Sequence, residues 1–478
     1  MEKKKLKEQT KTGVYWAFLN QFATYGMQFV IGIVMARLLS PEDYGITALP
    51  AVFIALASVF VDSGFGNALI RKPELTERDL STAFYYSLFI GISCYIILFM
   101  SSPWIADFYH IPILEDLLKI TALTFLWSPL GTPQRIILSR QLDFKTPTKI
   151  NVVTRLGSGI LGVLFAYMGY GIWALVISTL FSSFFGMLMN WLAVRWFPKT
   201  GWSKSSFKYL WGYGNKLLLS SLIDSAYKNI TPIFIGKFYK PGDLGMYNRA
   251  LGYANLPSQN ITQAIRSVTF PVLSKIQDDD VLLAQQYRRM LKTLCFVVFP
   301  LMIVLAGLAR PLVLIMLTEK WEGCVIYLQI LCFSQMWYPV AAINLNLLQV
   351  KGRSDLFLRL EIVKKIIGFI ILAFTLPLGI LYFCYGSVFC SLLEIFVNTY
   401  YTGKILNLGF MKQMRDIFPS ILLSLIVFVA LLVVVSFLHS LWLQISLGVI
   451  LSFIIYISGA RLFSFDELGD IKYMLSRR

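Results

Sequence analysis

Pro41-Glu42-Asp43-Tyr44-Gly45 and Pro241-Gly242-Asp243-Leu244-Gly245 are two copies of one short motif, P-x-D-x-G, placed 200 residues apart in a chain of 478. Each copy ends one long apolar segment and begins the next. Proline suits the first turn of a helix because its missing N–H has no intrahelical partner there, and the aspartate favours the positive end of the helix dipole. The motif therefore predicts helical hairpins and a chain built from two copies of one unit.

The composition is that of a membrane protein. Hydrophobic residues make up 57% of the chain and charged residues 14%, against roughly 25% charged residues in an average soluble domain. The net charge of +17 does not indicate nucleic-acid binding, because the basic residues lie between apolar segments and not on a solvated domain. We therefore expect an all-α polytopic membrane protein that binds no nucleic acid.

Apolar runs of about 20 residues, the length that crosses roughly 30 Å of hydrocarbon, occur fourteen times in the chain. The fourth, seventh and eighth are the most polar of them. The N-terminal run is too long for the apolar part of a signal peptide, so we expect it to stay as the first span. The predicted spans are residues 13–38, 44–70, 81–105, 113–138, 148–169, 171–197, 207–235, 244–270, 290–317, 323–350, 356–377, 379–402, 416–438 and 440–463.

The loops between the spans alternate in Lys and Arg content. Loops on one side, together with both ends of the chain, hold 30 of the 43 basic residues, and loops on the other side hold six. An excess of basic residues marks the cytoplasmic side of a membrane protein. Both termini are therefore predicted to be cytoplasmic, and the even number of spans agrees, because it puts both termini on the same side. The longest connection, residues 271–289, is expected to be a solvated cytoplasmic segment.

The repeated motif divides the spans into two lobes of six helices followed by two further helices. Because six is even, both lobes enter the membrane in the same orientation and should be related by a pseudo-twofold axis along the membrane normal, with a cavity between them. This is the plan of a transporter. The predicted parts are a tail at 1–12, an N-lobe at 13–200, a C-lobe at 201–405, a final helix pair at 406–465 and a tail at 466–478.

Ionisable residues inside the spans are costly in a membrane and normally face a partner or a wet cavity. The basic ones outnumber the acidic ones by seven to four, so the cavity should prefer an anion. They are Arg155, Lys216, Lys228, Arg249, Arg266, Lys364 and Lys365, against Asp62, Asp224, Glu361 and Glu394. The six cysteines are scattered without C-x-x-C spacing, and with two histidines in the chain neither a metal site, a cofactor nor an enzyme is expected.

The span at 244–270 carries the clearest polar face. At 100° per residue, Asn255, Gln259 and Arg266 share one face, and Arg249 and Asn260 lie beside it. Such a helix should line a wet cavity. The span at 13–38 offers a weaker counterpart, with the polar residues Asn20, Gln21, Thr24 and Gln28.

Each of these side chains also has a purely structural interpretation. Asp224 with Lys228, and Glu361 with Lys365, are spaced for intrahelical ion pairs. Lys364 and Lys365 lie near a span end and can extend to the membrane surface, and Arg249 and Arg266 stand towards opposite ends of their helix. We predict that Arg155 and Lys216 face the cavity. Asp62 either couples transport to an ion, as Asp224 and Glu394 would, or neutralises Arg155.

Five stretches resemble a known family, the Wzx-type polysaccharide flippases of the multidrug, oligosaccharidyl-lipid and polysaccharide (MOP) exporter superfamily, most closely its lipopolysaccharide and teichuronic acid exporters. The resemblance runs from about residue 12 to Lys404. The stretches are Ala36-Arg37-Leu38-Leu39-Ser40-Pro41-Glu42-Asp43-Tyr44-Gly45, Val61-Asp62-Ser63-Gly64-Phe65-Gly66, Leu142-Asp143-Phe144-Lys145, Asp243-Leu244-Gly245-Met246-Tyr247-Asn248-Arg249-Ala250 and Lys351-Gly352-Arg353-Ser354-Asp355.

The resemblance implies a MATE-like fold of fourteen helices in the bacterial cytoplasmic (inner) membrane. It implies alternating access, with undecaprenyl-diphosphate-linked oligosaccharide as the cargo for surface polysaccharide biosynthesis, and with membrane lipids and polysaccharide polymerase machinery as partners. A diphosphate requires cations in a low-dielectric cavity, and the sugar requires amides such as Asn255, Gln259 and Asn260. A single chain would enclose the pathway, so a monomer should function. Coupling to H⁺ or Na⁺ is a second hypothesis.

Two other functions are open. A cation-coupled multidrug antiporter of the same superfamily would share the architecture, but its cavity should have an acidic surplus. A membrane-embedded glycan polymerase or ligase would need a sizeable extracytoplasmic segment, and the predicted outer loops are short.

Overall fold

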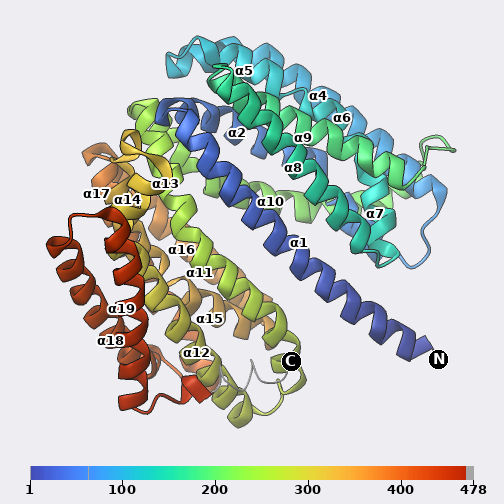
Figure 1. Cartoon of the computed structure of the whole chain (residues 1–478). Helices are drawn as coiled ribbons and strands as arrows, with labels where there is room; N and C mark the ends of the chain where they lie inside the picture. Colours follow the sequence, from blue (N-terminus) through green and yellow to red (C-terminus); the bar gives the residue numbers. More distant parts are fainter. Residues whose placement is uncertain (1, 63, 470–478) are drawn as a thin grey trace. The chain divides into compact units, whose positions relative to one another are not determined.

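The structure, a computed structural model, describes residues 2–62 and 64–469, and in this part of the chain helix is the only regular secondary structure (Figure 1). Each of the fourteen predicted spans is helical over most of its length. Within the described part, nine spans are long and hydrophobic enough to cross a membrane. The protein is therefore an all-helical multi-pass membrane protein, and the number fourteen stays a prediction.

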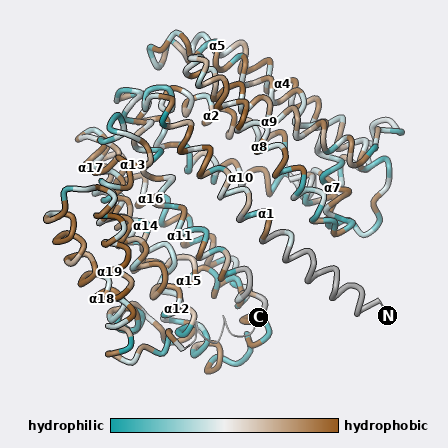
Figure 2. The backbone as a smooth tube through the Cα atoms, in the orientation of Figure 1, coloured by the Kyte–Doolittle hydropathy of each residue, from teal (hydrophilic) through white to brown (hydrophobic). Residues whose placement is uncertain are grey.

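The predicted spans outside these nine are mainly the ones that carry charges. They are α1 (Glu2–Leu38), α10 (Lys204–Phe238), α11 (Pro241–Lys275), α16 (Ser354–Thr375) and the broken segment at 113–138. Figure 2 shows the contrast with α18 (Phe410–Phe437) and α19 (Leu441–Leu462), which are hydrophobic along most of their length. These helices carry Lys216, Lys228, Arg249 and Arg266 of the predicted site, whereas Arg155 lies on one of the nine apolar spans, α8 (Lys145–Tyr167).

The chain divides into two compact units, Met1–Gly245 and Met246–Arg478. Helix α11 begins in the first unit and continues into the second. The helices of the first unit are α1 (Glu2–Leu38), α2 (Pro41–Asp62), α3 (Phe65–Arg71), α4 (Glu77–Tyr109), α5 (Ile113–Thr121), α6 (Thr124–Trp127), η1 (Pro129–Gly131), α7 (Thr132–Arg140), α8 (Lys145–Tyr167), α9 (Ile172–Ala193), α10 (Lys204–Phe238) and the start of α11 (Pro241–Lys275).

The second unit continues from α11 to the last described helix. Its other helices are α12 (Asp280–Gly307), α13 (Ala309–Leu317), η2 (Glu319–Trp321), α14 (Cys324–Gln335), α15 (Tyr338–Val350), α16 (Ser354–Thr375), η3 (Leu376–Leu378), α17 (Ile380–Leu406), α18 (Phe410–Phe437) and α19 (Leu441–Leu462).

Both copies of the P-x-D-x-G motif begin a helix, as predicted, because α2 starts at Pro41 and α11 at Pro241. At the first copy, the Asp43 carboxylate accepts hydrogen bonds from the Ser40 backbone N–H (2.8 Å) and hydroxyl (2.7 Å). The Ser40 hydroxyl in turn accepts from the Asp43 backbone N–H (3.1 Å). This reciprocal pair satisfies N–H groups that the first helical turn leaves open, so serine and aspartate fix where α2 begins.

Four predicted spans are not continuous helices. The span at 44–70 breaks at Gly64, which has a φ of 69° and lies against Gly214 and Leu217 of α10. The span at 113–138 consists of short helices, since Pro129 and Pro133 lack the N–H that a continuous helix needs and instead occupy first turns. The spans at 290–317 and 323–350 break after α12 and after α14.

In the first unit, α8 packs between α1 and α9, and α10 packs against α2, α3 and α4. The compact unit therefore extends past residue 200, the predicted end of the N-lobe. The loop between α3 and α4 is fixed by Arg140, which donates hydrogen bonds to the carbonyls of Leu69 (2.8 Å) and Pro73 (3.0 Å). One of the basic residues that indicates topology thus also holds the backbone of a neighbouring loop.

In the second unit, α12 is the central helix and packs against α14, α15 and α18. Phe296 and Ile303 of α12 belong to a buried apolar cluster with Leu423 and Val427 of α18. The Tyr456 hydroxyl of α19 donates to the Phe296 carbonyl (2.8 Å). The final two helices are therefore joined to the core of this unit.

The connection expected at 271–289 is mostly helical, and many of its residues are exposed. Helix α11 continues to Lys275 and α12 starts at Asp280. The Asp279 carboxylate caps α12, because it accepts from the backbone N–H groups of Val281 (3.1 Å) and Leu282 (2.9 Å). The predicted N-terminal tail is helical from Glu2 onward, and of the predicted C-terminal tail residues 470–478 lie outside the described residues.

Candidate functional site

Arg155 lies on α8, on the face that meets the polar residues of α1. Asn151, one turn earlier, donates a hydrogen bond to Asn20 of α1 (3.4 Å). The two helices run in parallel, since Thr148 contacts Trp16 and Gly159 contacts Ile31. Arg155 is therefore level with the turn of α1 that holds Thr24, and the weak polar face predicted on α1 is brought beside it. Its side chain is exposed.

Lys216 and Lys228 lie on α10, and both are exposed. Lys228 pairs with Asp224 one turn earlier (2.7 Å), with 70% and 45% of the two side chains exposed. The intrahelical pair that the spacing allowed is thus formed. In the described part of the chain, neither a hydrogen bond nor an ion pair engages the Arg155 guanidinium or the Lys216 ammonium.

Asp62 is the last residue of α2, and it is exposed. The charge that acts on its carboxylate is that of Arg135 on α7. Neutralisation of Arg155 by Asp62, which was one interpretation of this carboxylate, has no support in these contacts.

Arg249 lies in the first part of α11 and contacts two aromatic rings. Its guanidinium is 5.7 Å from the centre of the Tyr253 ring and 5.6 Å from that of Trp321. Trp321 is fully buried. Planar guanidinium groups stack favourably on such rings, so Arg249 is held against the protein.

The polar face predicted on α11 is present in the structure. Gln259 donates to Asn255 (3.1 Å), and Asn260 beside them is half-buried. Further along, Arg266 donates to the Gln349 side chain of α15 (2.5 Å). The amides stay accessible for hydrogen bonding, whereas Arg266 already has an amide partner within its own unit.

Glu394 on α17 belongs to a small charged cluster with α16. Lys364 forms an ion pair with Glu361 and also acts electrostatically on Glu394. Glu394 in turn accepts a weak hydrogen bond from the Cys390 thiol (3.8 Å). Lys364 is 8% exposed, so the expectation that it extends to the membrane surface is wrong. The Lys364 ammonium has its counter-charge in Glu361, less than one turn earlier on the same helix, and therefore does not need to reach water.

A buried amide network in the second unit is absent from the sequence-based site. Gln413 of α18 and Asn344 of α15 exchange two hydrogen bonds of 3.0 Å, and the Tyr287 hydroxyl of α12 donates to Gln413 (3.2 Å). All three residues are fully buried. The network links three helices that lie far apart in the sequence, and isolated polar residues in apolar runs gave no sign of it.

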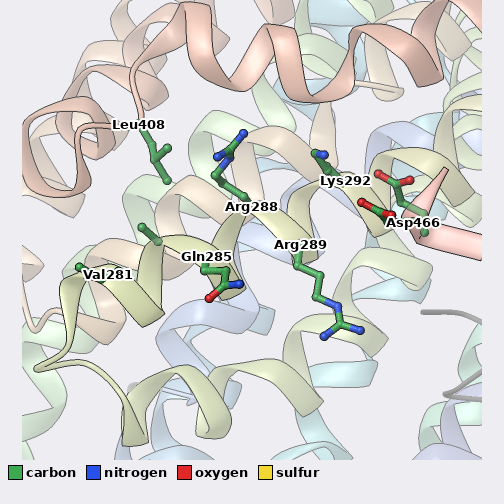
Figure 3. Close-up of a pocket in the computed structure, with 9 residues that line it drawn as sticks. Val281, Gln285, Arg288, Arg289, Lys292, Leu408 and Asp466 are labelled. Carbon is green, nitrogen blue, oxygen red and sulfur yellow. The ribbon is translucent and has the colours of Figure 1, made fainter. Parts of the chain in front are cut away.

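A pocket of about 700 Å³ opens beside the first turns of α12. Figure 3 shows Gln285, Arg288, Arg289 and Lys292 projecting from this stretch of the helix. Arg288 is fixed by two hydrogen bonds to Asp416 (2.7 and 2.5 Å). Asp466 and Glu467 complete the charged lining. From the sequence, these basic residues indicate membrane topology only. In the structure, the basic and acidic side chains around the pocket suit a polar ligand better than an apolar one.

The predicted site residues thus fall into two sets. Arg155, Lys216 and Lys228 belong to the first unit and are exposed, and the remaining basic residues belong to the second unit, where Arg249 and Arg266 have partners. Within each unit the contacts bring Arg155 to the polar face of α1 and bring Asn255 to Gln259. The chemistry available is anion binding by cations together with hydrogen bonding by amides.

Comparison with known proteins agrees with this architecture. The profile of the family described as "Polysaccharide biosynthesis protein" matches residues 34–326. The chain belongs to this family. It is 28% identical over 352 residues to the teichuronic acid biosynthesis protein TuaB of Bacillus subtilis, and the aligned region covers 73% of each chain. It is 25% identical over 365 residues to the lipopolysaccharide biosynthesis protein WzxC of Escherichia coli, with 75% of this chain and 73% of that protein covered.

The fold is similar to that of a solved membrane protein. The lipid II flippase MurJ in an inward closed conformation matches with a TM-score of 0.75 at 16% sequence identity, covering 94% of this chain and 100% of that one. At that identity the likeness shows the fold alone. The resemblance to a family of polysaccharide biosynthesis proteins, predicted from five short stretches, is confirmed.

Proposed function

We propose that this protein is a flippase that carries a lipid-linked oligosaccharide across the membrane for the synthesis of a surface polysaccharide. The observation that carries the proposal is membership of the polysaccharide biosynthesis family over residues 34–326, supported by the likeness of the fold to that of the lipid II flippase MurJ. We propose undecaprenyl diphosphate as the lipid carrier and alternating access as the mechanism, since the sequence resemblance implies both.

The exposed cations of the first unit are suited to a diphosphate. Arg155 can form two parallel hydrogen bonds to phosphate oxygens, and Lys216 supplies a compact point charge. Both lie on helices within the predicted membrane region, where low dielectric strengthens attraction to an anion. Lys228 is exposed despite its pair with Asp224, so it can contribute as well. We assign these three residues to headgroup binding.

The amide residues of α11 are suited to the sugar. Asn255, Gln259 and Asn260 each offer a donor and an acceptor, and their side chains are only half-buried. Arg249 and Arg266 would contribute positive field from their fixed positions. The lipid chain needs no polar contacts and can remain in the bilayer while the headgroup crosses.

Coupling to a gradient of H⁺ or Na⁺ would need a carboxylate that binds and releases a cation. Asp62, Asp224 and Glu394 are the candidates. Glu394 has the most suitable surroundings, because Lys364 and Glu361 act on it electrostatically. Export that continues unchanged after both gradients are collapsed would remove this part of the proposal.

We place the protein in the bacterial cytoplasmic (inner) membrane with both termini in the cytoplasm, on the basis of the Lys and Arg distribution. It acts as a transporter and not as an enzyme, works as a monomer, and passes its cargo to polysaccharide polymerase machinery. A cysteine placed in the α3–α4 loop, at Glu74, should react with a membrane-impermeant maleimide only after the cells are opened.

Deletion of the gene from its own host tests the function. We expect the loss of one surface glycan and accumulation of its polyprenyl-diphosphate oligosaccharide on the cytoplasmic leaflet, and a plasmid copy should reverse both. Cationic dye efflux should be unchanged. An unaltered glycan together with lost dye efflux would instead favour the antiporter, the alternative that the fold also permits.

A further inference from the structure

The pocket at the start of α12 has a basic wall and an acidic wall, both within the second compact unit. The basic wall is one face of α12 and consists of Arg288, Arg289 and Lys292 (Figure 3). The acidic wall is the segment after α19 and consists of Asp466 and Glu467. The charge of Arg288 is already matched by an aspartate of α18. Two basic and two acidic side chains of the lining therefore remain for a ligand.

The acidic wall is held in place by the apolar core of the unit. Phe465 and Leu468, on either side of the two carboxylates, pack on the buried cluster of α12, α18 and α19. The ring centre of Phe465 is 5.8 Å from that of Phe296, and the Phe465 backbone N–H donates to the Ala460 carbonyl of α19 (2.9 Å). The two carboxylates are therefore carried by a packed segment.

Glu467 is buried without a counter-charge. It is 5% exposed, and in the part of the chain that the structure describes no ion pair or hydrogen bond engages its carboxylate. Among the described residues, the half-buried Lys292 ammonium has no such partner either. A buried charge is costly unless it is paired. The pocket, of about 700 Å³, therefore suits a ligand that brings a cation to one wall and an anion to the other.

The pocket lies at the membrane surface. The span predicted at 290–317 begins within the basic wall, and the span predicted at 440–463 ends just before the acidic wall. Both ends are predicted to be cytoplasmic from the Lys and Arg distribution. Leu462 and Phe463, directly before the acidic wall, are exposed and can contact acyl chains. The ligand is therefore expected at the level of the lipid headgroups.

We propose that this pocket binds the headgroup of an amine-bearing phospholipid, phosphatidylethanolamine, from the cytoplasmic leaflet. Glu467 and Asp466 bind its ammonium group, and Lys292 and Arg289 bind its phosphate through charge-assisted hydrogen bonds. The two carboxylates would repel a diphosphate, so this site is separate from the residues assigned to the cargo. The bound lipid joins α12 to the segment after α19. This inference does not depend on the proposed function.

Lipid binding to the purified full-length protein tests the inference. Native mass spectrometry should give a dissociation constant for phosphatidylethanolamine about tenfold lower than for phosphatidylglycerol, which has no amine, or for phosphatidylcholine, whose trimethylammonium group donates no hydrogen bond. In Glu467→Gln this preference should disappear, while phosphatidylglycerol should bind at least as tightly as it does to the wild type, which also shows that the variant is folded. Asp278→Asn, at an exposed position outside the pocket, is the matched control and should keep the preference.

The basic wall is tested by Lys292→Ala. This variant should bind phosphatidylethanolamine about tenfold more weakly, because the phosphate loses a charge-assisted hydrogen bond. Lys275→Ala, at an exposed lysine outside the pocket, is the matched control and should bind it as the wild type does. Soluble glycerophosphoethanolamine, which has the headgroup without acyl chains, should bind about tenfold or more weakly than the lipid, because it buries no acyl surface.

Three results would overturn the inference. Equal dissociation constants for the three lipids in the wild type would show that the pocket does not select an amine. A preference that survives in Glu467→Gln would place the lipid elsewhere on the protein. A soluble headgroup that binds as tightly as the whole lipid would show that the ligand is not a membrane lipid.

Discussion

The basic residues of the first unit and those of the second are held in different ways. Arg155 and Lys216 are exposed, and in the described residues no ion pair or hydrogen bond engages their charged groups. In the second unit Arg249 stacks on aromatic rings, Arg266 bonds to an amide and Lys364 is buried beside Glu361. Basic residues in similar helices therefore differ in whether the protein itself supplies a partner for their charge.

A charge within a membrane requires a partner. Where the protein supplies one, as for Lys364, the charge belongs to the scaffold. Where the protein supplies no partner, as for Arg155, water or an anion of the cargo must be the partner. On this basis we propose that headgroup binding belongs chiefly to the first unit and structural support chiefly to the second. The following substitutions test this division.

The largest effect is expected from Arg155→Ala/Lys216→Ala. Each charge-assisted hydrogen bond to the diphosphate is worth roughly 1.5–3 kcal/mol, so the double substitution should lower the export rate about 100-fold or more. Protein abundance in the membrane should not change, because neither charged group holds the fold together. Surface glycan measured by antibody or lectin binding, with Arg155→Lys/Lys216→Arg as the charge-preserving control, checks this. Unchanged export would remove both residues from the site.

The next effect is on stability in the second unit. Gln413→Ala would leave the buried Asn344 amide and the Tyr287 hydroxyl without their partner, and each such group costs roughly 1–3 kcal/mol. We expect the free energy of unfolding to fall by about 2–6 kcal/mol. Thermal unfolding of the purified protein measures it. Lys216→Ala is the matched control and should unfold at the wild-type temperature, whereas equal losses in both variants would erase the distinction between the units.

A smaller effect is expected at Arg249. Arg249→Lys keeps the charge but loses the planar stacking on Tyr253 and Trp321, which is worth about 1 kcal/mol. The unfolding temperature should fall while export per molecule stays near the wild-type value. Lys228→Arg, at an exposed position, should leave the temperature unchanged. A lost export rate with normal stability would place Arg249 among the headgroup ligands instead.

The smallest change in stability is expected for the exposed pair on α10. Exchanging its charges in Asp224→Lys/Lys228→Asp retains the pair, so stability should alter by less than about 0.5 kcal/mol. Export should nevertheless fall severalfold, because the cation moves by one helical turn. Full export from the exchanged variant would indicate that Lys228 only completes a surface pair.

The sequence predicted the positions of the helices more accurately than the positions of the breaks within them. Length and hydropathy located the apolar segments, since these properties are local. The break at Gly64 depends on its contact with Gly214, 150 residues later, and no local pattern records such a contact. The charge rules likewise predicted an ion pair on α10, which is formed, whereas the ion pair of Glu361 with Lys364 on α16 was not predicted.

The candidate site was predictable to a similar extent. The polar face of α11 followed from helical geometry, because several amides share one face of one helix. The network of Tyr287, Asn344 and Gln413 did not, because it needs three helices to be placed correctly before their single polar residues meet. Which basic residues are exposed and which are held also depends on tertiary packing, and this distinction is what the structure adds.

The central claim is that exposed cations of the first unit attract the diphosphate of a lipid-linked oligosaccharide. It is tested most directly by reconstituting the protein in liposomes that contain a labelled polyprenyl-diphosphate oligosaccharide and following the appearance of its sugar at the outer leaflet with an impermeant lectin. Wild-type protein should move this lipid, should move an uncharged analogue about 100-fold more slowly, and should lose the preference in Arg155→Ala/Lys216→Ala. Equal rates for the charged and uncharged lipids with the wild-type protein would contradict the claim.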